Sequence, residues 1–63
     1  MKSYQIMFNT KDGRINEAFC KQMENQRNLE VTDALTAIER RFGIQPEEVE
    51  GISYYPMEPV VLM

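Results

Sequence analysis

An alternating segment near the start of the chain restricts the fold more than any other feature. Tyr4, Ile6 and Phe8 occupy every second position of residues 3–10, with mostly polar side chains between them. A period of two with β-forming residues on the apolar side predicts a strand that buries one face. Met7 interrupts the polar side, which indicates that the second face is also partly covered. A lone strand leaves its backbone groups unpaired, so the chain has to supply partner strands.

A hairpin turn is predicted at residues 10–14, which read Thr-Lys-Asp-Gly-Arg. Asp12 tolerates the left-handed backbone region and Gly13 prefers it. We predict a second strand over about residues 14–22, because it would pair with the first. The composition of this segment favours a helix instead, and its apolar residues also suit helical spacing. That alternative would give the order β-α-α-β.

The best-defined element is a helix over residues 33–42. Its apolar side chains recur at helical spacing and form one stripe. They are Ala34, Leu35, Ile38 and Phe42. Thr32 is expected to cap the start of the helix. Gly43 is expected to end it in a left-handed conformation, which would fold Ile44 back onto the apolar stripe.

The last third of the chain predicts a short helical turn and a third strand. The turn covers residues 45–51 and stops at Gly51. The strand follows over residues 52–55. Pro56 and Pro59 cannot donate hydrogen bonds to a sheet, so this strand is expected to be short or to lie at an edge.

Together these elements predict one small α+β domain over residues 1–63, with residues 56–63 as a further apolar strand or a tail. The order is β-β-α-β. A crossover through the helix makes the third strand parallel to the second. Placed beside the first strand, it completes a three-stranded antiparallel sheet of order 2-1-3, with one helix packed on one face.

The composition excludes several kinds of chemistry. The chain has no histidine, and Cys20 is its only cysteine. An internal disulfide, a structural zinc site of four Cys or His ligands and a Ser–His or Cys–His catalytic pair are therefore impossible. Glu47, Glu48 and Glu50 form an acidic cluster without the spacing of a calcium-binding loop. We predict a protein that is not an enzyme, with no catalytic or metal-binding residues and no cofactor.

The C-terminal segment of the chain is rich in apolar residues, and this suggests how the protein acts. Apolar residues are usually buried, either in the core or against another chain. The predicted interface residues are Tyr54, Tyr55, Met57, Val60, Val61 and Leu62. Small domains without disulfides or metals often use oligomerisation for stability. The main hypothesis is therefore a protein-interaction module that self-associates and binds or inhibits another protein. A phage or mobile-element accessory protein is one form of that role.

The alternative hypothesis is a small nucleic-acid-associated regulator that uses Arg27, Arg40, Arg41 and exposed tyrosines. The net charge of −3 argues against it, because nucleic-acid binders normally present a basic surface. Neither a signal peptide nor a membrane span is predicted, since the longest apolar run, Val60–Met63, is far too short to cross a bilayer. A cytoplasmic location is expected.

Overall fold

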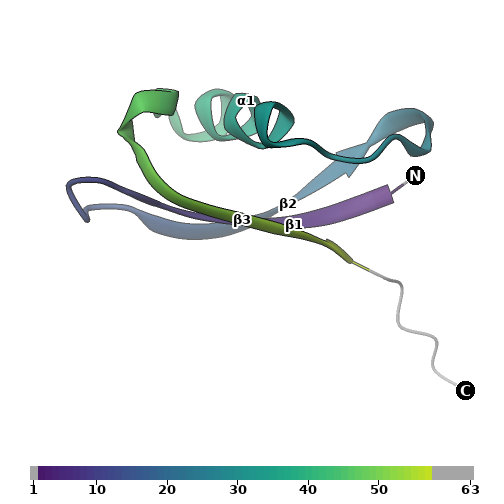
Figure 1. The fold of residues 1–63 in the computed structure, drawn as a ribbon, viewed down its shortest axis with the longest axis horizontal. Helices are drawn as coiled ribbons and strands as arrows, with labels where there is room; N and C mark the ends of the chain where they lie inside the picture. The colour runs from purple at the N-terminus through teal and green to yellow at the C-terminus, as the bar shows by residue number, and fades with distance from the viewer. Residues whose placement is uncertain (1, 58–63) are drawn as a thin grey trace, which may run out of the picture.

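The computed structural model describes residues 2–57, which form a three-stranded antiparallel sheet with one helix on one face (Figure 1). The strands are β1 (Lys2–Thr10), β2 (Asn16–Met23) and β3 (Val49–Met57), and the helix is α1 (Val31–Phe42). Two 3-10 helical turns complete the elements, η1 (Glu24–Gln26) and η2 (Pro46–Glu48). The sheet order is β2-β1-β3. The predicted β-β-α-β order and 2-1-3 sheet are confirmed.

The register decides which side chains share a face. On β1, Ile6 lies opposite Phe19 of β2 and Tyr54 of β3. Successive strand residues point to opposite faces. The even-numbered residues of β1 therefore share the helix-facing side with the odd-numbered residues of β2 and the even-numbered residues of most of β3. The pairing of β2 with β1 confirms the predicted second strand after the hairpin, and the helical alternative for this segment is wrong.

The core lies between α1 and the helix-facing side of the sheet. Ile6 at its centre and Ile38 on α1 are fully buried. Other buried apolar residues surround them, namely Tyr4, Phe8, Phe19, Met23, Leu29, Ala34 and Ile44. The rings of Phe8, Phe19 and Phe42 pack edge to face, with centroids 5.2–6.4 Å apart. Edge-to-face geometry adds a specific attraction to the burial of these large side chains.

The start of α1 differs from the prediction, whereas its end agrees. The helix begins at Val31, with Glu30 rather than Thr32 as the N-cap residue. The carboxylate of Asp33 accepts a hydrogen bond of 3.0 Å from the backbone N–H of Glu30. Gly43 ends the helix at φ 73° and donates its N–H to the carbonyl of Glu39 at 2.9 Å. This left-handed ending is the one that glycine favours.

Two turn predictions need correction. In the hairpin, only Gly13 adopts the left-handed region, at φ 74°. Asp12 instead accepts hydrogen bonds from the Thr10 hydroxyl at 2.7 Å and from the backbone N–H of Arg14 at 3.1 Å. Gly51 does not stop an element, because β3 already begins at Val49. A Cβ at Gly51 would come 2.5 Å from the side-chain oxygen of Asn9, so a larger residue there would displace the Asn9 side chain.

Ile38→Ala tests the packing of α1 on the sheet. Removing most of a fully buried side chain leaves a cavity, so we expect the free energy of unfolding to fall by about 2–5 kcal/mol. Urea unfolding followed by circular dichroism measures this loss. Val31→Ala is the matched control on the same helix, because Val31 is 45% exposed. Equal stability of the two variants would contradict the described core.

Candidate protein-interaction surface

The structure separates the residues of the predicted interface. Tyr54 points to the helix side and packs, partly buried, against the core. Tyr55 and Met57 point to the other side of the sheet and are 47% and 42% exposed. Three further members of the predicted interface, Val60, Val61 and Leu62, lie outside the described residues. Tyr55 and Met57 therefore share a surface that Tyr54 does not reach.

That surface is the side of the sheet away from α1, which we name the open face (Figure 1). From the register, it consists of Ser3, Gln5, Met7 and Asn9 of β1, Asn16, Ala18, Cys20 and Gln22 of β2, and Gly51, Ser53, Tyr55 and Met57 of β3. None of these residues is charged, although 27% of the chain is. The acidic residue of β3, Glu50, has no partner on β1, because the register shifts between the pairs Asn9–Gly51 and Thr10–Val49. It lies beyond the paired residues that form the open face. The open face is thus electrically neutral.

The open face also holds most of the exposed large apolar side chains that the structure describes. They are Met7 at 40%, Tyr55 at 47% and Met57 at 42%, and the fourth is Val31 at 45% at the start of α1. Methionine and tyrosine are enriched in protein interfaces, where charged residues are depleted. Met7 was not among the predicted interface residues, although its place on the polar side of the alternation was a signal.

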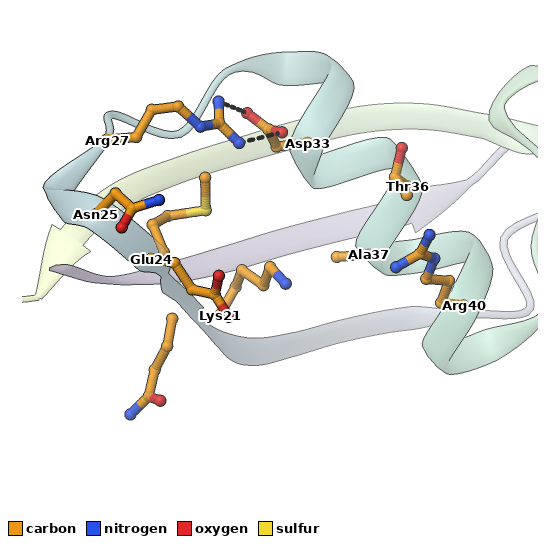
Figure 2. A pocket seen from close by; sticks show the side chains of 10 residues that line it. Lys21, Glu24, Asn25, Arg27, Asp33, Thr36, Ala37 and Arg40 are labelled. Atoms are coloured by element: carbon orange, nitrogen blue, oxygen red, sulfur yellow. Dashed lines mark hydrogen bonds and ion pairs between the residues drawn. The ribbon is translucent and has the colours of Figure 1, made fainter. Parts of the chain in front are cut away.

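The predicted basic residues lie on the helix side and are partly engaged. Arg27 forms a two-pronged ion pair with Asp33, with both N–O distances at 2.9 Å (Figure 2). The guanidinium of Arg41 lies over the ring of Phe19, 5.4 Å from its centroid. Arg40 and Lys21 line a cavity of about 350 Å³ between β2 and α1.

The ion pair changes the acidity of its carboxylate. Hydrogen bonds from the Arg27 guanidinium and from the backbone N–H of Glu30 lower the pKa of Asp33 from its ordinary value of 3.8 to about 2. The same contact raises the pKa of Arg27. The carboxylate thus serves both the cap of α1 and the loop that precedes the helix.

The tyrosines of the nucleic-acid hypothesis are not gathered beside these arginines. Tyr4 is buried, and its hydroxyl donates to the side-chain oxygen of Asn28 at 3.3 Å. Tyr54 is partly buried on the helix side, and only Tyr55 is exposed, on the open face. A surface that combines Arg27, Arg40 and Arg41 with exposed tyrosines is therefore not present among the described residues.

Two further observations concern other kinds of site. Within residues 2–57, no three His, Cys, Asp or Glu side chains lie close enough together to hold a metal ion. Neither α1 nor another helical segment in the described part of the chain is long and apolar enough to cross a membrane.

Comparison with known proteins identifies no relative: no family model, curated protein or solved structure matches the chain. The function is therefore argued from the geometry and chemistry of the surfaces.

The ion pair between Arg27 and Asp33 predicts a specific acid sensitivity. The pKa of Asp33 is about 2 in the folded protein and ordinarily 3.8, so its carboxylate binds protons less readily when the chain is folded. The ionised carboxylate therefore stabilises the folded state fully above about pH 4, and this stabilisation is lost as the pH falls toward 2. We expect the melting temperature of Asp33→Asn to fall less steeply over this range than that of the wild type. Melting curves by circular dichroism at several acid pH values measure the slope.

Glu47→Gln is the control for this experiment. Glu47 is exposed and takes part in no ion pair among the described residues. Its variant should keep the wild-type slope. The assigned role of Asp33 would be contradicted if its variant kept that slope too.

Proposed function

We propose that this chain is a non-enzymatic protein-interaction module that pairs with a second copy of itself through the open face and acts by binding another protein. The observation that carries the proposal is the absence of charge across the open face, together with its exposed Met7, Tyr55 and Met57.

Electrostatics favour the open face as the place of self-association. Each copy carries a net charge of −3, so two copies repel each other over most approaches. Two open faces meet without opposing like charges. Sheets pack face to face at about 10 Å, a distance that side chains such as Met7 and Tyr55 can fill. The polar side chains of Gln5 and Asn9 could then form hydrogen bonds across the interface or to water.

Symmetry suits this surface as well. In a two-fold dimer the same patch of both copies forms the interface, so the patch has to be complementary to itself. Met7 lies on the central strand, with Ala18 of β2 on one side and Ser53 of β3 on the other. Two small neighbours leave space beside Met7 into which the side chain of a second copy can insert.

The size of the open face sets the expected affinity. Three strands about 4.8 Å apart, over seven residues of about 3.3 Å each, give a patch of roughly 300 Å² in projection. Stable protein interfaces usually bury about 800 Å² on each partner. We therefore expect a weak, reversible dimer rather than an obligate one.

Met7→Glu tests the proposed dimer. A carboxylate at the centre of the open face would face its own copy across the interface, so the variant should remain at 7.4 kDa, whereas the wild type should approach twice this mass as its concentration rises. Sedimentation equilibrium over a wide concentration range measures both.

The matched control for that experiment is Val31→Glu. It adds the same charge at an equally exposed apolar residue on α1, away from the open face. This variant should associate like the wild type. A wild type that stays monomeric at every concentration, or two variants that behave alike, would overturn the proposal.

Cys20 provides an independent readout, because it is the only cysteine and its side chain is exposed on the open face. Dimerisation through this face would cover the thiol. We expect its reaction with a soluble aromatic disulfide to slow several-fold as protein concentration rises through the dimerisation range. In Met7→Glu the rate should not depend on concentration. A wild-type rate that is equally independent would place the interface elsewhere.

A further inference from the structure

The outer edge of β2 presents unpaired backbone groups. The backbone N–H of Thr10 donates to the carbonyl of Ile15 at 3.0 Å, and hydrogen-bonded pairs alternate along an antiparallel ladder. The even-numbered residues of β1 therefore bond to β2, through its odd-numbered residues. The residues of β2 whose N–H and C=O groups point outward are Asn16, Ala18, Cys20 and Gln22. No other strand of the described chain pairs with this edge.

The other edge of the sheet is poorly suited to strand addition. By the same alternation, Ile52, Tyr54 and Pro56 of β3 point their backbone groups outward. Pro56 has no N–H to donate, and the register shift near Val49 bends the start of the strand. Strand β2 contains neither proline nor glycine. It is therefore the edge that can accept another strand.

A cationic groove runs beside the edge of β2. Figure 2 shows the cavity of about 350 Å³, and a second one of about 320 Å³ shares Lys21, Ala37 and Arg40 with it. The first is also lined by Arg27 and the second by Arg41. Four of the seven basic residues of an acidic chain thus lie along one groove.

Two of these cations remain available for a ligand. The acids that line the groove are Glu24 and Asp33, and Asp33 is engaged by Arg27. Neither Lys21 nor Arg40 forms an ion pair with a described residue. Figure 2 shows Lys21 on the side of β2 and Arg40 on α1, on opposite walls of the cavity. An anionic side chain placed along the edge of β2 would lie close to both cations, Lys21 and Arg40.

We propose that the outer edge of β2 binds an acidic, extended segment of another protein as a fourth, antiparallel strand. Backbone hydrogen bonds to β2 would hold the segment, and every second side chain would face the groove. Carboxylates at those positions would meet Lys21 and Arg40. The intervening side chains would lie beside Ala18 and Cys20 on the open-face side, where small apolar residues fit. The backbone groups that would hold the segment lie at the edge of the sheet and the groove lies on its helix side, whereas the proposed dimer interface is the open face, which this strand would adjoin only at Ala18 and Cys20.

A peptide fits this site better than a nucleic acid does. The edge of β2 offers both N–H donors and C=O acceptors, which a peptide backbone complements. A phosphodiester backbone supplies acceptors only. Base stacking would need aromatic side chains near the groove, but the exposed Tyr55 lies on the open face, and the ring of Phe19 is already covered by Arg41.

The test uses the full chain and a blocked octapeptide of alternating Glu and Val. Binding should shift the amide signals of Ala18, Cys20 and Gln22 in NMR spectra and slow the exchange of these amide protons. The amides of Ile52 and Tyr54 on the other edge should stay unchanged. A peptide with Lys in place of Glu should bind at least tenfold more weakly.

Backbone methylation separates strand addition from simple charge attraction. In the proposed register the Val residues donate their N–H groups to β2, whereas the Glu residues point theirs away. N-methylation of the Val residues should therefore weaken binding at least tenfold, and N-methylation of the Glu residues should leave it within about threefold. Equal effects of the two modifications would overturn the proposal.

Protein variants test the groove. Arg40→Glu should weaken binding at least tenfold, whereas Lys11→Glu, the same charge change in the exposed hairpin loop, should have little effect. Met7→Glu should bind the peptide like the wild type even if it no longer dimerises. This variant therefore tests strand addition at β2 independently of dimerisation through the open face. Salt-dependent binding of a single-stranded DNA oligonucleotide without binding of the peptide would overturn this one in favour of a nucleic-acid interface.

Discussion

The packing of α1 on one face of the sheet is the interaction on which the other features depend. Ile38 on the helix and Ile6 on the central strand are both fully buried, and the register brings the apolar residues of the other strands to the same side. The alternation that places Ile6 and Phe8 under α1 also places Gln5 and Met7 on the opposite side. Because α1 covers only one side of the sheet, residues 2–57 leave the opposite side uncovered. Its lack of charge is not required by the core.

The sequence predicted the strands, the helix and the order of the sheet, because these depend on periodic patterns and local turn residues. The sequence was a poorer guide to the cap of α1 and to the role of Gly51, because contacts between distant parts of the chain determine both. The cap of α1 is built around Asp33, whose carboxylate is held by Arg27 from the preceding loop. Gly51 looked like the end of an element, but it lies inside β3 opposite Asn9 of β1, whose side chain occupies the space beside it. Neither partner is visible from the local sequence.

The candidate surface was predictable only in part. An apolar run near the C-terminus indicated an interface, but adjacent residues of a strand point to opposite faces, so Tyr54 joins the core while Tyr55 joins the open face. Met7 could be recognised as part of the open face only once its position on the central strand was known. The edge of β2 could not be identified either, since it requires both the sheet order and the phase of the hydrogen-bond ladder.

The two proposed surfaces are geometrically compatible. Face-to-face packing of two sheets covers Met7 and Tyr55 but leaves the edges of both sheets free. A two-fold dimer would then carry two β2 edges, each beside its own Lys21 and Arg40. A partner with two acidic segments could engage both edges at once, and the second contact would form at a high effective concentration. Weak self-association and weak strand addition could thus combine into a tight complex, with the dimer providing the valency and the groove providing the choice of partner.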